Sequence, residues 1–205
     1  MFYDPREGRH GLPHDPFYAL VAPRPIGWIS TLSPAGVRNL APYSFFNAFS
    51  TSPHIVGFSS TGRKDTLANV EATGAFVCNL ATDDLRDAMN RSSAVVGPEV
   101  DEFDLAGLSA APGRSVPVPR VAESPAALEC RHTATIPLAG ADGAPARAFL
   151  VLGEVVGIHI DDTVLTEGRI DVARMRPLAR LGYRDYSVVD AVFEMARPGE
   201  GPRGG

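Results

Sequence analysis

The sequence predicts a mainly β protein with short helices, in which six strands joined by turns form an antiparallel barrel or sandwich. Three observations support this fold class. The 205 residues include 20 glycines and 18 prolines, which favours turns and short strands over long helices. Six segments are rich in β-branched and aromatic residues. Apolar residues make up 44% of the chain, enough for a core that needs no disulfide or metal.

The six strand-like segments are residues 25–33, 37–50, 54–60, 75–80, 126–138 and 147–160. Pro42 has no N–H group for a sheet hydrogen bond, so it predicts an edge strand or a bulge in the second segment. In the fifth segment, Leu128 and Cys130 share one face of the expected strand, while Glu129 and Arg131 share the other. The last segment is the strongest strand prediction because it is rich in Val, Ile and Leu.

Two short helices are expected between the strands. Asp65–Thr73 has the pattern of a helix that Gly74 ends. Thr82 is expected to cap a second helix, because Asp83 and Asp84 follow it in the first turn, where acidic side chains suit the helix dipole.

Two further segments have the composition of irregular structure. Residues 97–125 are rich in proline and glycine around one possible helical turn at 102–108, and such a stretch is usually a functional lid or a mobile loop. Residues 197–205 are rich in glycine, proline and charge, which predicts a disordered tail. We therefore expect one domain, residues 1–196, followed by this tail.

Charge and cysteine usage disfavour several classes of protein. The formal net charge is −5, which disfavours nucleic-acid binding. The longest apolar run, residues 148–160, contains Glu154 and is too short to span a bilayer. The N-terminus lacks the apolar core of a signal peptide, so a cytoplasmic protein without membrane contact is expected. Cys78 and Cys130 lie in apolar runs and are expected to be buried free thiols, without the spacing of a zinc site.

The sharpest functional signal is the turn at residues 61–66, which reads TGRKDT. A phosphate group needs paired donors and positive potential. Arg63, Lys64, the Thr66 hydroxyl and the free N–H groups of a helix N-terminus supply both. Ser59 and Ser60 precede this turn and suit the oxygens of a ribityl-like chain. From these residues alone, an ordinary solvated helix start remains the alternative interpretation.

Two extended segments combine aromatic rings with polar groups. Alternation along a strand places Trp28 with Ser30 on one face, and Ile29 with Thr31 on the other. In the next segment, Tyr43, Phe45 and Asn47 share a face, and Ser44 lies between them. Aromatic faces can line a flat ring system, and an amide can bind its carbonyl groups. Core packing is the alternative role for these aromatic residues.

One histidine stands out. His159 ends the last strand-like segment and is followed by Asp161 and Asp162. Such a group can do acid–base chemistry or bind a metal, and a strand-end histidine before an acidic turn is the alternative. None of the five histidines pairs with another at metal-ligand spacing, so no metal site is expected. Dinucleotide, Walker and nucleophile-elbow motifs are absent from the sequence.

In combination, seven motifs resemble the flavin reductase-like family of FMN-binding split barrels. In chain order they are RPIGWIST, NLAPYSFFN, VGFSSTGRKDT, FVCNL, RVAESPAALEC, LGEVVGIHIDD and PLARLGYRDYSVVD. The resemblance covers about residues 18–189, most of the chain, and the motifs are weak singly but specific together. The resemblance implies a six-stranded antiparallel Greek-key barrel that forms a homodimer, with the flavin near the subunit interface.

The resemblance also implies roles for individual residues. The phosphate would be held by Arg63, Lys64 and Thr66. The ribityl chain and the ring would be lined by Ser30, Thr31, Ser44, Asn47, Ser59 and Ser60, with the backbone of Phe45. Tyr186 and His159, the candidate catalytic residue, would approach the site late in the chain.

The activity implied is that of an NAD(P)H-dependent flavin reductase, in which hydride passes from nicotinamide C4 to flavin N5. FMN is favoured over FAD because only one phosphate-binding turn is visible. Reduced flavin would serve a monooxygenase or an electron acceptor. Three alternatives stay open. In the first, the protein is a flavoenzyme that retains FMN and acts on an organic substrate under a lid at 97–125. In the second, it is a flavin electron carrier or redox sensor. In the third, it is a split-barrel relative that binds pyridoxal phosphate or haem.

Overall fold

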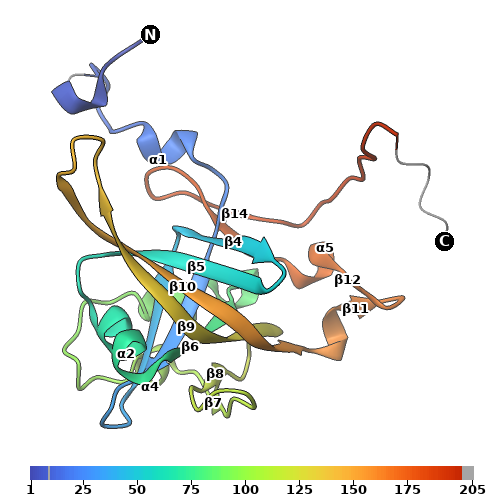
Figure 1. Cartoon of the computed structure of the whole chain (residues 1–205). Helices are drawn as coiled ribbons and strands as arrows, with labels where there is room; N and C mark the ends of the chain where they lie inside the picture. Colours follow the sequence, from blue (N-terminus) through green and yellow to red (C-terminus); the bar gives the residue numbers. More distant parts are fainter. Residues whose placement is uncertain (9, 200–205) are drawn as a thin grey trace.

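The computed structural model describes residues 1–8 and 10–199 and is built mainly of β-strands (Figure 1). Its principal sheet is antiparallel and has the strand order β3-β2-β6-β9-β10-β5-β4. The strands of this sheet are β2 (Gly27–Leu32), β3 (Arg38–Tyr43), β4 (Phe46–Thr51), β5 (His54–Thr61), β6 (Ala75–Leu80), β9 (Ala126–Ala139) and β10 (Pro145–Ile160). The long hairpin β9–β10 crosses the whole molecule (Figure 1).

The order of the strands shows that the sheet curls upon itself. Strands β3 and β4 lie at opposite edges of the sheet, yet only Ser44 and Phe45 connect them. The three residue steps from Tyr43 to Phe46 span at most about 11 Å, so the two edges must adjoin. The Tyr43 and Phe58 rings pack across this seam with centroids 4.6 Å apart, and the Ser59 N–H donates to the Phe45 carbonyl at 2.8 Å.

The expected mainly β architecture is confirmed, but the expected number of six strands is wrong for the principal sheet, which has seven. The difference arises because the segment 37–50 forms two strands rather than one. Both halves are extended and apolar, so composition does not reveal that the chain passes from one edge of the sheet to the other between them. Pro42 lies on the edge strand β3, as its missing donor predicts.

The first predicted helix is confirmed as α2 (Asp65–Thr73), which Gly74 ends with φ 72°. The second helical segment consists of η2 (Asp83–Leu85) and α3 (Arg86–Arg91). The predicted cap at Thr82 is wrong, because its side chain makes no capping hydrogen bond. Thr82 is instead held in a β-bridge with Pro177.

Shorter elements surround the principal sheet. A three-stranded sheet is formed by β1 (Arg24–Pro25), β13 (Leu178–Arg180) and β14 (Tyr186–Val188), and two small pairs by β7 (Ala110–Ala111) with β8 (Arg120–Val121) and β11 (Leu165–Thr166) with β12 (Arg169–Ile170). The remaining helices are η1 (Pro5–Glu7), α1 (Phe17–Leu20), α4 (Glu102–Ala106), η3 (Asp162–Val164) and α5 (Val172–Met175).

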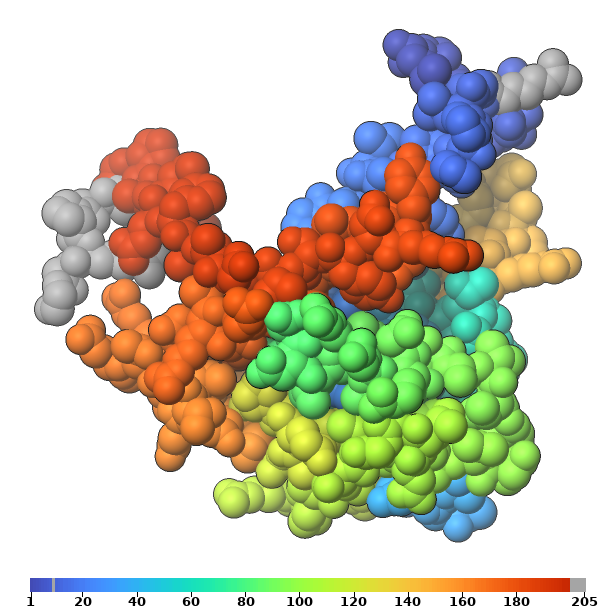
Figure 2. Space-filling view, turned by 180° about the vertical axis from the view of Figure 1, so that it is seen from behind, coloured from blue at the N-terminus to red at the C-terminus, as the bar shows by residue number. Residues whose placement is uncertain are grey.

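Residues 97–125 are built into the core. The segment contains α4 and the β7–β8 pair, and it covers much of the lower surface seen from behind (Figure 2). Phe103, Val118 and Val121 are completely buried. Phe103 and Val121 belong to the same apolar cluster as Trp28. The segment therefore packs as a fixed cover, and not as the free lid or mobile loop that its composition suggests.

Three further expectations concern the ends of the chain and the cysteines. Residues 200–205 of the predicted tail lie outside the described residues. Cys78 and Cys130 are buried and free, as predicted. Across the described ranges, no helix combines the length and the apolar character needed to cross a membrane.

Candidate functional site

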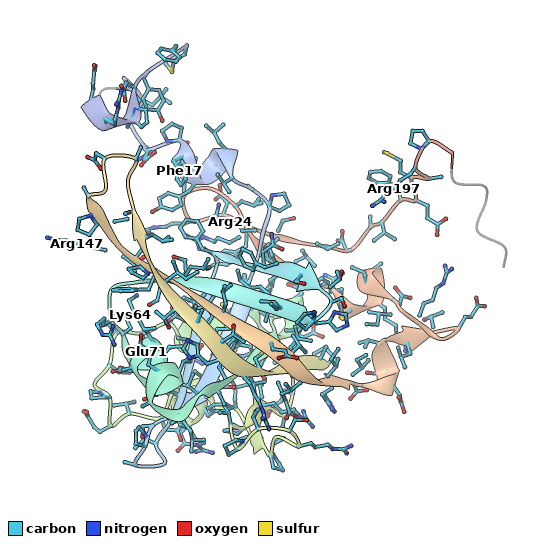
Figure 3. All side chains as sticks on the ribbon, viewed as in Figure 1. Phe17, Arg24, Lys64, Glu71, Arg147 and Arg197 are labelled. Atoms are coloured by element: carbon cyan, nitrogen blue, oxygen red, sulfur yellow. The ribbon has the colours of Figure 1, made fainter. Side chains whose placement is uncertain are left out.

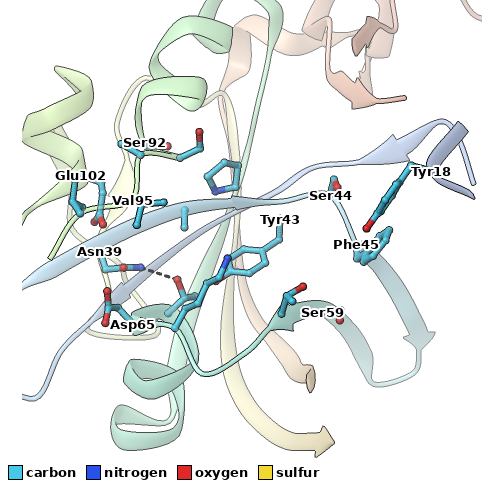
Figure 4. Close-up of a pocket in the computed structure, with 18 residues that line it drawn as sticks. Tyr18, Asn39, Tyr43, Ser44, Phe45, Ser59, Asp65, Ser92, Val95 and Glu102 are labelled. Carbon is cyan, nitrogen blue, oxygen red and sulfur yellow. Dashed lines mark hydrogen bonds between the residues drawn. The ribbon is translucent and has the colours of Figure 1, made fainter. Parts of the chain in front are cut away.

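A cavity of about 460 Å³ lies where β3, the start of α2 and residues 92–96 meet (Figure 4). Strand β3 and the link after it supply Asn39, Tyr43, Ser44 and Phe45. The turn before α2 supplies Lys64. The cavity thus forms at the seam between the two edges of the curled sheet, where the edge strands have backbone polar groups that do not pair with a neighbouring strand.

One end of the cavity is rich in hydrogen-bond donors. Lys64 occupies the N-cap position of α2 and makes no capping hydrogen bond with its side chain, so the N–H groups of the first turn remain available. Thr66 is buried and its hydroxyl oxygen accepts from Asn39 at 3.0 Å, which leaves its proton free to donate. The Lys64 side chain lines the same end. Donors, a cation and the positive end of a helix dipole therefore converge here.

Tyr43 adds an anomaly at this end. Its side chain is 8% exposed, and within the described residues its hydroxyl has no hydrogen-bond partner. A buried polar group without a partner is costly, and in native structures it usually has a partner in the functional state. Burial raises the pKa of Tyr43, while the nearby hydroxyls of Thr66 and Ser60 act in the opposite direction, so the phenol stays protonated and lies close to the Thr66 hydroxyl that lines the cavity.

The other end of the cavity is aromatic. The Tyr18 and Phe45 rings stack with centroids 5.9 Å apart and an interplanar angle of 17°, and both line the cavity. A second cavity of about 280 Å³ shares Tyr18 and Ser44 with the first, so the two adjoin. Tyr186 lines this second cavity.

The structure brings five of the predicted site residues together. Five of the predicted residues are among those that line the first cavity: Ser44, Phe45, Ser59, Lys64 and Thr66. Tyr186 lines the adjoining cavity. Ser60 is fully buried and donates to the Gly62 carbonyl. Successive residues of a strand point to opposite faces, so Ser59 and Ser60 cannot both face one cavity.

The other predicted binding residues lie elsewhere. Ser30 and Thr31 are completely buried and bonded to protein groups, Ser30 to the Pro119 carbonyl and Thr31 to Asn69. The exposed Asn47 accepts the Ala48 N–H.

Arg63 also points away from the cavity. Its guanidinium pairs with Glu71 and lies 5.8 Å from the centroid of the Phe149 ring. Figure 3 shows Lys64 and Glu71 at α2. Of the two adjacent cations in the basic turn, only Lys64 faces the cavity.

His159 is also separate from this site. It lines a cavity of about 510 Å³ together with Arg114, Arg120 and Glu129, and that cavity shares no described residue with the other two. Burial and the charge of Arg120 lower the pKa of His159. Asp161 accepts from the N–H and hydroxyl of Thr163. In the described part of the chain, no group of three or more His, Cys, Asp or Glu side chains is placed to hold a metal ion.

Two features of the site were not predicted as such. Glu102 on α4 lines the cavity and accepts the Leu40 N–H at 3.0 Å. Residues 92–96 form the opposite wall. Neither segment carries a recognisable ligand motif, and both reach the cavity only through the packing of α3 and α4 against β3.

Glu102 gives the site a pH-dependent stability. Burial raises its pKa, although the Leu40 N–H acts in the opposite direction. A carboxyl group with a raised pKa favours folding while it is protonated, and this contribution is lost as pH rises through the raised value. We expect Glu102→Gln to raise the free energy of unfolding at pH 7 and to lose this advantage below pH about 4. Urea unfolding of the wild-type protein and the variant at the two pH values measures this effect. A stability difference between the two proteins that does not change with pH would contradict the prediction.

Comparison with known proteins supports a family assignment. Residues 20–186 match the model of the flavin reductase like domain. A protein of uncharacterized function from Halalkalibacterium halodurans is 39% identical over 184 residues, which is 87% of each chain.

Two solved structures extend the likeness to three dimensions. Nitrilotriacetate monooxygenase component B from Bacillus cereus has a TM-score of 0.86 and 30% identity, and the match covers 95% of this chain and 98% of that one. The 2-nitrobenzoate 2-nitroreductase of Pseudomonas fluorescens has a TM-score of 0.79 and 27% identity, with 92% of each chain covered. The chain belongs to the flavin reductase-like family of split-barrel flavoproteins.

Proposed function

We propose that the protein binds FMN in the 460 Å³ cavity and acts as an NAD(P)H-dependent flavin reductase. The observation that carries this proposal is the end of the cavity where Lys64, the Thr66 hydroxyl and the uncapped start of α2 converge. These groups match the needs of a phosphate monoester, which has several acceptor oxygens and a negative charge. The residues present therefore fit the phosphate of FMN.

The remaining walls suit the rest of the molecule. Ser44 and Ser59 lie between the donor-rich end and the aromatic end, where a ribityl chain would need hydroxyl partners. Tyr18 and Phe45 offer stacked rings beside which a flat ring system can pack. Asp65 and Glu102 are carboxylates at the donor-rich end, and they disfavour a second phosphate there, which supports FMN over FAD.

The bound flavin would supply the chemistry by accepting hydride at N5 from the nicotinamide of NADH or NADPH. The protein binds and orients the ring, and its walls exclude water. No catalytic carboxylate or triad is required. His159 lies in another cavity of the same chain, so a role for it in orienting nicotinamide would require the partner subunit of a homodimer.

Two points about partners follow as proposals. Exposed apolar side chains on β10 and after β14, including Ile158 at 58% and Phe193 at 84% exposure, support a homodimer. The likeness to a monooxygenase component supports delivery of reduced flavin to an oxygenase. The proposed compartment is the cytoplasm, which supplies reduced nicotinamide.

A second function has a specific observation in its favour. The likeness to a nitroreductase and the additional 280 Å³ cavity support an enzyme that retains FMN and reduces an organic substrate.

An anaerobic experiment separates the two functions. The purified protein is loaded with FMN, NADH or NADPH is added, and flavin absorbance is followed. Rapid bleaching is expected for the reductase. Tightly bound flavin that stays oxidised until an organic substrate or another donor is supplied would favour the second function, and failure to bind flavin would overturn both.

A further inference from the structure

Arg24 is a buried cation without an anionic partner. Arg24 is only 6% exposed. Nη1 donates to the Tyr18 and Val21 carbonyls and Nη2 to the Leu181 carbonyl. Its Nε has no hydrogen-bond partner among the described residues. Buried charges in proteins are normally paired with an opposite charge, whereas the Arg24 guanidinium is held by carbonyl oxygens and by the Tyr18 and Phe45 rings, whose centroids lie 5.8 and 5.6 Å away.

A second arginine lies in the same place, and it is half-buried. Arg180 lines the 280 Å³ cavity together with Arg24. It donates to the Tyr183 carbonyl at 2.5 Å and lies 4.4 Å from the centroid of the Tyr186 ring. Within the ranges that the structure describes, neither arginine has a carboxylate within ion-pair distance. Carbonyl oxygens orient the two guanidinium groups but do not neutralise them.

The walls of this cavity define the rest of the ligand. Ile26 and Met89 are buried apolar side chains, and Tyr18 and Tyr186 contribute rings. An apolar and aromatic wall with two unneutralised guanidinium groups fits a small molecule that has a flat apolar body and a carboxylate. Guanidinium binds carboxylate through two parallel hydrogen bonds, which gives both affinity and orientation.

We propose that the 280 Å³ cavity is a binding site for a small organic carboxylate, held by Arg180 and Arg24 next to the flavin ring. The proposal deepens the proposed function, because the cavity shares Tyr18, Pro42 and Ser44 with the cavity assigned to FMN. Arg24 lies well away from Lys64 in Figure 3. The carboxylate site is therefore separate from the phosphate end.

Benzoate and its neutral isostere benzamide are suitable probes. Their binding is measured by isothermal titration calorimetry with the flavin-free protein and with the FMN-loaded protein, and in the loaded protein also by the change in flavin absorbance. We expect benzoate to bind at least tenfold more tightly than benzamide. We expect Arg180→Gln to weaken benzoate binding at least tenfold.

Arg184→Gln is the matched control, because Arg184 is an exposed arginine of the same turn that does not line this cavity. It should change benzoate affinity less than twofold. Equal affinity for the two probes, no benzoate binding, or equal losses in the two variants would each overturn the proposal. A shift of the flavin reduction potential in Arg180→Gln with unchanged benzoate affinity would also overturn it, by assigning the arginine to the flavin.

The same titrations distinguish failure of the carboxylate site from failure of the proposed FMN-binding function. Benzoate binding that depends on Arg180 in a protein that does not bind FMN would support the carboxylate site and contradict the proposed function. FMN binding without benzoate binding would do the reverse.

Discussion

Replacing Lys64 by alanine is expected to weaken FMN binding by about 1.5–3 kcal/mol, the usual range for a hydrogen bond to a charged group. This corresponds to about a 10- to 150-fold rise in Kd. Lys64 is the one cation of the TGRKDT turn that lines the cavity, and its loss would leave the phosphate with hydroxyl and backbone donors only. Quenching of flavin fluorescence during titration measures the change.

Arg63→Ala is the matched control for this variant. Arg63 is the adjacent residue and carries the same charge, but its guanidinium pairs with Glu71 and lies outside the cavity. Its loss should therefore cost FMN affinity less than about 1 kcal/mol, the range of an exposed ion pair. Equal losses in the two variants would show that the phosphate is not bound as we propose.

Replacing Glu129 by alanine is expected to lower the free energy of unfolding by about 2–4 kcal/mol, because it removes a charged acceptor and leaves several donors without a partner. The carboxylate is 4% exposed and accepts the N–H groups of Arg114, Ser115 and Val116. It therefore fixes the start of the segment that completes the His159 cavity. Urea unfolding at pH 7 measures the loss.

The pH dependence of this stabilisation follows from the same contacts. Burial acts to raise the pKa of Glu129, but the three N–H groups together lower it. A lowered pKa gives stability that is present above the unfolded value and is lost as pH falls through the folded one. The wild-type advantage over Glu129→Ala should thus shrink in acid.

Glu123→Ala provides the comparison, because this exposed glutamate accepts a single backbone N–H, that of Ser109. A loss below about 1 kcal/mol is expected for it. If Glu129→Ala is no more destabilising than Glu123→Ala, the anchoring role of Glu129 is refuted.

Local patterns predicted most of the elements of this fold. The helix at Asp65–Thr73 and the strand at Ala75–Leu80 have the predicted boundaries, because apolar spacing and Gly74 define them within a few residues. The break at Ser44 and Phe45 was not predictable in this way. It depends on which strands pair, and two extended segments of similar composition look like one strand.

The candidate site was predicted unevenly for a related reason. The basic turn is a local feature, so Lys64 and Thr66 were found. Alternation on β5 already implies that Ser59 and Ser60 face opposite sides. The buried state of Tyr43, the ion pair of Arg63 and the position of Glu129 depend on contacts between distant segments. Glu129 was expected on a polar strand face, but residues 114–116 cover it.

The most direct test of the phosphate site compares FMN with riboflavin, which lacks only the phosphate. Calorimetric titration of both ligands into wild-type protein and into Lys64→Ala isolates the contribution of that group. The account predicts that wild-type protein binds FMN at least 100-fold more tightly than riboflavin, and that Lys64→Ala reduces this difference in affinity. Equal affinity for FMN and riboflavin in the wild-type protein would contradict it.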